Sequence, residues 1–396
     1  MLFELKNRRS FFLGAFFCIS CFFATCQTLP IQVGANATGE YFPLLYLKKI
    51  GVVANHTSVI FKNDQQTKYT HLVDSLQHSG INVQRVFSPE HGFRGKADAS
   101  EHISDGRDTQ TGIAIVSLYG KNKKPSPAQL KDLDMLVFDI QDVGVRFYTY
   151  ISTLHYVMEA CAENNIPLIL LDRPNPNGHY VDGPILQMEH QSFVGMHPVP
   201  LVYGMTIGEY ATMIQGEQWL QNKVSCDLTV IPLKNYTHQS SYHLPIRPSP
   251  NLPNDLAINL YPSLGFFEGT TINAGRGTEF QFQRYGAPWF SKTAFSYTPK
   301  PNFGAKYPKH RNKICYGVDL SQHEKIAKVN IAWLKDAYQK TLNKENFFGK
   351  TFTVHAGNRL LKKQLKKNYT VRTIEKSWKK DLKRFKKIRD KYLRYP

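Results

Sequence analysis

The side chains best suited to chemistry in this 396-residue sequence follow short apolar runs. They are Asn55, Glu90, His91, Tyr119, Asp139, Asp142, Asp172 and Arg173. Carboxyl groups and histidine are common groups for acid–base catalysis, and polar neighbours can bind a substrate. If the runs are parallel strands, their polar ends meet at one edge of a sheet, so we expect a functional site at that edge.

The apolar runs predict strands, and the segments between them predict helices. Strands are expected at 51–55, 82–87, 113–119, 135–142 and 167–172, and helices over 70–76, over 148–164 and after Thr206. Thr206, followed by Glu209 three residues later, predicts a capping box at the last helix. Continuous apolar strands that alternate with helices are typical of a parallel sheet with helices on both faces. The fold class is therefore α/β, with a Rossmann-like parallel sheet.

Beyond about residue 235 the composition changes, with five prolines between 245 and 262. Proline at this density excludes a regular helix or a central strand. We expect this segment to be either a linker between domains or a rigid loop that faces the site. The glycine-rich loops that follow it carry Arg276 and Glu279 beside aromatic residues.

The first residues predict export rather than a folded element. Three basic residues within 1–9 precede an apolar stretch that runs to Ala24, which is the pattern of a secretory signal peptide over 1–26. The residues up to Cys26 loosely match a lipoprotein cleavage box, so Cys26 is a candidate lipid anchor; the alternative is plain cleavage near Gln27. We expect an exported protein, either periplasmic or anchored to a membrane of a bacterial envelope.

Motifs for cofactors and for other hydrolase classes are missing from the sequence. There is no P-loop, no GxGxxG after the first strand, no GxSxG, no HExxH and, beyond the predicted signal peptide, no CxxC pair. Asp139 and Asp142 with His91 could bind a metal, but the signal is weak. We expect neither a cofactor nor a metal, and an esterase or a deacetylase is disfavoured.

A series of motifs, matched in order along the chain, carries a family resemblance. They lie at 88–95 (SPEHGFRG), 139–150 (DIQDVGVRFYTY), 171–176 (LDRPNP), 181–184 (VDGP), 203–209 (YGMTIGE), 248–253 (PSPNLP), 261–279 and 286–289 (GAPW). A basic segment at 385–393 is similar to a closing helix. Together these motifs resemble the exo-β-N-acetylmuramidase NamZ family of peptidoglycan-recycling glycosidases, from about residue 50 to the C-terminus.

The resemblance implies a Rossmann-like domain over 30–235, a smaller α/β (α+β) domain over 236–396, and an active site in the cleft between them. It implies an exo-acting enzyme that releases N-acetylmuramic acid from the non-reducing end of peptidoglycan fragments. Glu90 matches the glutamate usually proposed as catalytic in this family. The alternative is a non-catalytic lipoprotein of the same fold that binds cell-wall fragments.

Glycoside hydrolysis usually needs one protonated carboxyl group, which donates to the leaving oxygen, and a second carboxylate. We expect Glu90 to be the acid, because burial at a strand end would raise its pKa towards neutrality; alternatively, Glu90 caps the following helix. Asp139 and Glu268 are assigned to catalysis beside it, with Asp142 and Glu279 as further candidates for the second carboxylate. The acetamido group of the substrate could instead act as the nucleophile.

The remaining polar side chains are assigned to binding the sugar. The expected substrate-binding set is Asn55, His91, Asp142, Arg146, Tyr148, Arg173, Asn175, Arg276 and Glu279. The planar guanidinium of arginine suits the lactyl carboxylate of muramic acid, although each arginine could be purely structural. Asp142 could instead form a salt bridge with Arg146, Tyr148 could belong to the core, and Asn175 could form a turn among prolines.

The formal net charge of +19 is concentrated near the C-terminus, where residues 340–396 hold 19 Lys or Arg and 4 Asp or Glu. In this segment Trp378, Leu382, Phe385, Ile388 and Tyr392 recur at helical spacing. They predict a helix that docks through its apolar stripe and leaves a basic face in solvent; alternatively, that face binds anionic wall polymer or lipid headgroups. Nucleic acid is the least expected partner, because export is predicted and this charge lies apart from the acidic strand ends.

Overall fold

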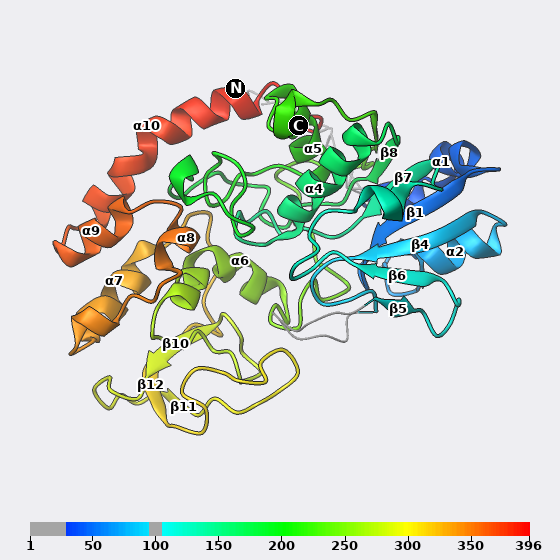
Figure 1. The fold of residues 1–396 in the computed structure, drawn as a ribbon. Helices are drawn as coiled ribbons and strands as arrows, with labels where there is room; N and C mark the ends of the chain where they lie inside the picture. Colours follow the sequence, from blue (N-terminus) through cyan, green and yellow to red (C-terminus); the bar gives the residue numbers. More distant parts are fainter. Residues whose placement is uncertain (1–28, 95–104) are drawn as a thin grey trace, which may run out of the picture.

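A seven-stranded sheet forms the centre of the computed structural model, which describes residues 29–94 and 105–396 (Figure 1). The strands are β1 (Lys49–Ala54), β4 (Asn82–Ser88), β5 (Gly106–Arg107), β6 (Ala114–Ser117), β7 (Met135–Asp139), β8 (Leu168–Leu171) and β9 (Leu228–Ile231). Their order is β5-β6-β4-β1-β7-β8-β9, and only β5 pairs antiparallel to its neighbour. The predicted signal peptide and Cys26 lie outside the described residues.

The five predicted strands are confirmed as β1, β4, β6, β7 and β8, and the α/β class with them. β9 was not predicted. It is an edge strand of four residues in which only Ile231 is buried.

Helices cover both faces of the sheet, as the apolar strands require. They are α1 (Thr38–Leu45), α2 (Leu72–His78), α3 (Pro127–Leu130), α4 (Tyr150–Glu163) and α5 (Ile207–Gly216). Along each strand the side chains alternate between two cores: Val53 and Phe138 pack with α4 and α5, whereas Val52 and Val137 pack with α1 and α2. The predicted capping box at the start of α5 is present.

The helix expected over 70–76 begins two residues later than predicted, at Leu72. Residues 69–71 instead form β3 (Tyr69–His71), which pairs with β2 (Val59–Phe61) in a small antiparallel ribbon. His71 ends this ribbon and caps α2, because its ring nitrogen Nδ1 accepts from the backbone N–H of Val73 at 3.2 Å.

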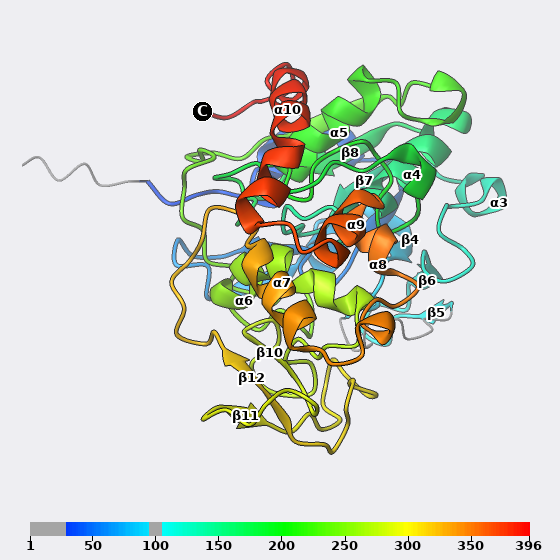
Figure 2. The same cartoon turned by 90° about the vertical axis from the view of Figure 1, so that its left-hand side faces the viewer.

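The rest of the chain continues below the first part, where β10, β11 and β12 lie lowest, and then returns upwards through α9 to α10, which lies near α5 (Figure 2). Its elements are α6 (Asp255–Leu264), the 3₁₀ helix η4 (Gly265–Gly269), β10 (Arg284–Ala287), β11 (Ser296–Tyr297), β12 (Cys315–Asp319), α7 (Ile331–Lys340), α8 (Phe352–Ala356), α9 (Leu360–Lys366) and α10 (Val371–Arg389). The strands form an antiparallel sheet in the order β10-β12-β11. The expectation that prolines exclude a helix up to residue 262 is wrong, because Asn254 caps α6 just after the proline cluster and Pro262 removes only one N–H donor.

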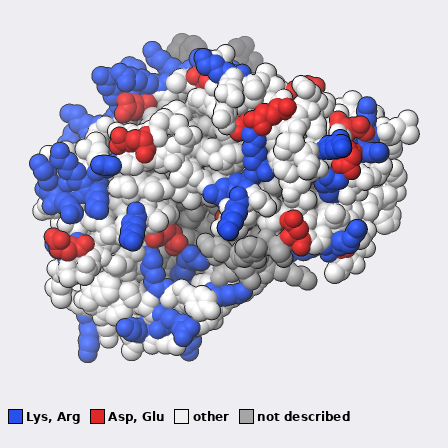
Figure 3. Space-filling view, viewed as in Figure 1, with Lys and Arg blue, Asp and Glu red and all other residues white. Residues whose placement is uncertain are grey.

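The amphipathic C-terminal helix is confirmed as α10, with Ile374, Trp378, Leu382 and Phe385 buried. This helix packs back on the first part of the chain. The indole Nε1 of Trp378 donates to Asp182 Oδ1 at 3.0 Å. Lys and Arg side chains gather over α9 and α10 at the upper left of Figure 3. Within the described ranges, no helix has both the length and the apolar character needed to cross a membrane.

Candidate active site

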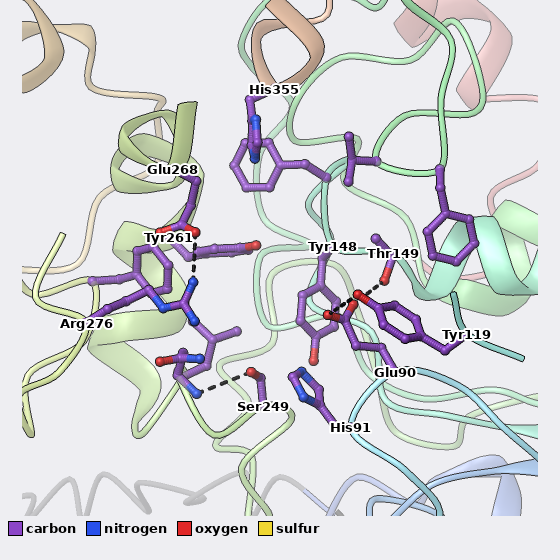
Figure 4. A pocket seen from close by; sticks show the side chains of 16 residues that line it. Glu90, His91, Tyr119, Tyr148, Thr149, Ser249, Tyr261, Glu268, Arg276 and His355 are labelled. Atoms are coloured by element: carbon purple, nitrogen blue, oxygen red, sulfur yellow. Dashed lines mark hydrogen bonds and ion pairs between the residues drawn. The ribbon is translucent and has the colours of Figure 1, made fainter. Parts of the chain in front are cut away.

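A cavity with about 800 Å³ of empty volume opens between the carboxyl edge of the large sheet and the second part of the chain. Its walls come from the ends of β4 and β6, the segment before α4, the proline-rich segment, α6 with η4, and α8 (Figure 4). The lining residues are Glu90, His91, Tyr119, Phe147, Tyr148, Thr149, Phe193, Val194, Ser249, Asn251, Leu252, Tyr261, Glu268, Arg276, Phe282 and His355. Part of this volume is open to solvent, and small-molecule ligands usually bind in clefts of this kind.

Glu90 enters the cavity from the loop that follows β4. Its two carboxyl oxygens are oriented by hydroxyl groups from two other segments: Tyr119 donates to Oε1 at 3.1 Å and Thr149 donates to Oε2 at 3.0 Å (Figure 4). The next residue, His91, is buried, lines the cavity and has a positive φ of 72°. Such a backbone conformation is uncommon for a residue other than glycine and often accompanies functional sites.

Glu268 lies on the opposite wall, in η4 (Figure 4). Arg276 Nη1 approaches Glu268 Oε2 at 2.9 Å, and both side chains are partly exposed. Burial raises the pKa of Glu268, but the charges of Arg276, Lys309 and His355 together outweigh this effect and hold the pKa below its usual value. Glu268 is therefore an ionised carboxylate at neutral pH.

Tyr148 and the residues behind it form the floor of the cavity. The hydroxyl of Tyr148 donates to the backbone oxygen of Pro248 at 2.6 Å, which fixes the proline-rich segment against α4. Asn55 does not reach the lining. It supports the floor from below, because its Nδ2 donates to the hydroxyl of Tyr150 at 2.8 Å, and Tyr150 packs edge-on against Tyr148.

Asp139 and Arg173, predicted as a catalytic and a substrate-binding residue, are absent from the cavity lining. Arg173 Nε donates to Asp139 Oδ1 at 2.5 Å, and Nη2 donates to Oδ2 at 2.8 Å. The two side chains are 2% and 0% exposed. Each group is buried and paired with the other, so the structure places neither of them in the cavity lining.

Asp142 is also buried outside the lining, where it organises the turn before α4. Its Oδ2 accepts from the backbone N–H of Gly144 at 2.7 Å and from the hydroxyl of Tyr203. Burial raises the pKa of Asp142 to about 7, although these two hydrogen bonds act in the opposite direction. Asp142 thus lies outside the cavity lining, and Arg146 bonds backbone oxygens rather than its carboxylate.

Arg146 is fully buried and bonds backbone oxygens instead of a carboxylate. It donates to Pro184 at 2.6 Å, to Val199 at 3.0 Å and to His355 at 3.0 Å. Burial lowers its pKa to about 10. Arg146 therefore does not contact the cavity, but it fixes the backbone of His355, whose side chain does line it.

Two further predicted binding residues lie outside the lining. Asn175 forms a turn, since its Oδ1 accepts from the backbone N–H of Asn177 and its Nδ2 donates to Met205, each at 2.8 Å. Glu279 is exposed to solvent. In the part of the chain that the structure describes, no three His, Cys, Asp or Glu side chains come together as a metal site would require.

Five predicted site residues do line the cavity, namely Glu90, His91, Tyr148, Glu268 and Arg276. The sequence analysis did not assign Thr149, Tyr261 or His355 to the site. Thr149 belongs to a motif that was recognised, whereas no local pattern pointed to His355 in α8. Ser249 and its neighbours line the cavity, so the proline-rich segment is a loop that faces the site.

Sequence models of one protein family match most of the chain. The model described as exo-beta-N-acetylmuramidase NamZ, N-terminal, matches residues 50–256, and its C-terminal counterpart matches 259–395. A curated protein of Bacillus subtilis (strain 168), named peptidoglycan beta-N-acetylmuramidase NamZ, is 38% identical over 94% of this chain and 93% of its own length.

Solved structures of two DUF1343 family proteins from Bacteroides fragilis NCTC 9343 share the fold. The first is 45% identical, with a TM-score of 0.84 over 92% of this chain and 99% of its own. The second is 28% identical, with a TM-score of 0.79 over 93% of this chain and 100% of its own.

Proposed function

The chain belongs to the exo-β-N-acetylmuramidase NamZ family, and on that premise we propose that it is a glycoside hydrolase that releases N-acetylmuramic acid from the non-reducing end of peptidoglycan fragments. The observation that supports a catalytic role most directly is the placement of two carboxyl groups, Glu90 and Glu268, on facing walls of one cavity (Figure 4). Two carboxyl groups are the usual requirement of glycoside hydrolysis.

We assign the role of general acid to Glu90. Tyr119 and Thr149 orient its carboxyl group, so its proton can pass to the glycosidic oxygen as the bond from that oxygen to the anomeric carbon breaks. Positive charge then develops on the sugar ring. The ionised Glu268 faces the same space and supplies the second carboxylate of the scheme.

We propose that the same wall recognises muramic acid. Arg276 places a guanidinium group in the lining, which suits the lactyl carboxylate that distinguishes this sugar from N-acetylglucosamine. Leu252 and Phe282 provide apolar surface for the methyl groups of the acetamido and lactyl substituents. The cavity therefore combines a cationic and an apolar wall with the two carboxyl groups.

The decisive experiment measures release of a chromogenic aglycone from an N-acetylmuramic acid glycoside. We expect Glu90→Gln to abolish turnover while the ligand still binds, and Glu268→Gln to reduce turnover severely. Glu279→Gln is the matched control, because it is the same substitution at an exposed position outside the cavity. Unchanged turnover in Glu90→Gln would remove Glu90 from the mechanism. Tight binding without any turnover by the parent protein would favour a binding protein instead.

We also propose that the protein is exported and that Cys26 carries a lipid anchor, on the basis of the N-terminal sequence alone. Metabolic labelling with an alkyne fatty acid should mark the parent protein and a Cys21→Ser variant, but not Cys26→Ser. Labelling that survives the loss of Cys26 would contradict the anchor.

A further inference from the structure

The outer side of α10 carries a row of basic residues, here called the basic face: Arg372, Lys376, Lys380, Lys383 and Lys387. All five are exposed, and none forms an ion pair with an acidic residue in the described ranges. Further exposed lysines on α9 extend the positive surface, which covers the upper left of the molecule in Figure 3. Within 359–389 there are 14 Lys or Arg and two acidic residues.

The opposite side of α10 is already occupied. Ile374, Trp378, Leu382 and Phe385 are buried in the core of the protein, at spacings of three or four residues. The helix therefore has no free apolar face to insert into a bilayer. The basic face can therefore bind a partner only through the charges of its exposed side chains, because the apolar side of α10 is buried in the protein.

The basic face is not an extension of the active site. No residue of α9 or α10 lines the cavity, which receives only His355 from the C-terminal helices. Substrate binding therefore does not account for this accumulation of charge.

The segment that follows α10 ends close to the point where the described chain begins. Asn235 donates to the backbone oxygen of Pro30 at 3.0 Å, and the hydroxyl of Tyr395 accepts from the backbone N–H of Leu233 at 3.0 Å. The two ends of the described chain thus meet on one strip of residues, 233–235. Two residues lie between Cys26 and Leu29, so even an extended chain would span no more than about 11 Å between them. A lipid on Cys26 would therefore begin near the point where the segment after α10 meets the start of the described chain.

We propose that the basic face of α10 binds a membrane surface rich in anionic phospholipid headgroups. The inference goes beyond hydrolysis, and its choice of a lipid partner rests on the proposed anchor at Cys26. Clusters of four to eight Lys or Arg beside a membrane attachment point commonly bind anionic lipid headgroups through their charge. Stable attachment to a membrane usually takes two signals, and a lipid chain together with a basic surface would supply them.

The test uses the chain from Gln27 onward, which keeps every described residue and lacks the lipid. Co-sedimentation is measured with vesicles of pure phosphatidylcholine, with vesicles that contain about one-third phosphatidylglycerol, and with purified peptidoglycan. We expect binding to the anionic vesicles alone, and its loss between about 0.05 M and about 0.5 M NaCl, because salt screens charges at a surface. The variant Lys376→Gln/Lys380→Gln/Lys383→Gln/Lys387→Gln should bind at least about tenfold more weakly.

A matched control removes four exposed charges elsewhere, in Lys62→Gln/Lys68→Gln/Lys121→Gln/Lys131→Gln, and should bind as the parent does. Equal loss in both quadruple variants would mean that only net charge matters and would overturn the proposal. So would binding to peptidoglycan in preference to vesicles, or no binding of the parent to anionic vesicles. Both variants should release the chromogenic aglycone at the parental rate, so this proposal can fail while the hydrolase assignment stands.

Discussion

Asp139→Asn should lose much of its stability and keep its turnover rate. Asparagine has nearly the same shape as aspartate, but it cannot neutralise Arg173, whose side chain is 2% exposed and makes bonds of 2.5 and 2.8 Å to Asp139. Removing one partner of a buried ion pair leaves a charge without compensation and typically costs about 3–5 kcal/mol. With unfolding entropy near 2.1 cal/mol/K per residue, a folded chain of roughly 360 residues would lose about 4–7 °C in melting temperature.

The assay compares the melting temperature with kcat on the chromogenic glycoside, below the melting range of the variant. Asp132→Asn is the matched control, because Asp132 is half exposed and pairs with Arg85 at the surface at 2.8 Å. Its loss should cost no more than about 1 kcal/mol. Asp139→Asn/Arg173→Met should recover much of the lost stability, since it removes both charges at once. Lost turnover with an unchanged melting temperature would refute the reasoning and return Asp139 to the catalytic site.

Two predictions concern the pH response of other carboxyl groups. In Arg276→Met the pKa of Glu268 should rise, because the charge of Arg276 opposes the effect of burial, and the acid limb of the pH profile of kcat should then move to higher pH. The control Arg276→Lys keeps the charge and should resemble the parent. An acid limb that does not move in Arg276→Met would contradict the assigned charge state of Glu268. Burial raises the pKa of Asp142 from 3.8 to about 7, so the folded state favours the protonated carboxyl group. Protonated Asp142 therefore stabilises the folded state fully below about pH 4, and this contribution is lost as the pH rises through about 7. Asp142→Asn imitates the protonated form, so the melting temperature of the variant relative to the parent should rise between pH 4 and pH 7, and a constant difference would count against the shift.

Sequence patterns predicted strands whose residues are mostly apolar. In β1, β7 and β8 nearly every residue is also buried, whereas β9, a short edge strand in which only the last residue is buried, was not predicted. The site was predicted in part for a similar reason. Glu90 and Glu268 lie in local motifs that can be recognised, but His355 reaches the cavity through α8, far along the chain from Phe282, the lining residue that precedes it in sequence.

The position of the cavity shows why the polar residues at the strand ends did not by themselves predict which side chains line the site. In the observed strand order, the chain leaves β1 towards β4 and leaves β7 towards β8, so the direction of winding switches between β1 and β7. Ligands of open α/β sheets commonly bind at such a switch point, and the rule favours Asn55 and Asp139. Those side chains are instead engaged with Tyr150 and Arg173.

The end of β8 is closed in the same way by a residue from the far end of the chain. Tyr395 donates to Asp172 Oδ2 at 2.6 Å, and Thr206 donates to the same oxygen at 2.8 Å. Among the polar residues expected at the strand ends, Glu90 after β4 and Tyr119 after β6 line the cavity. Tertiary contacts made by residues distant in sequence thus decide which strand ends remain accessible, and they place the proposed acid two positions from β7 rather than at the switch point itself.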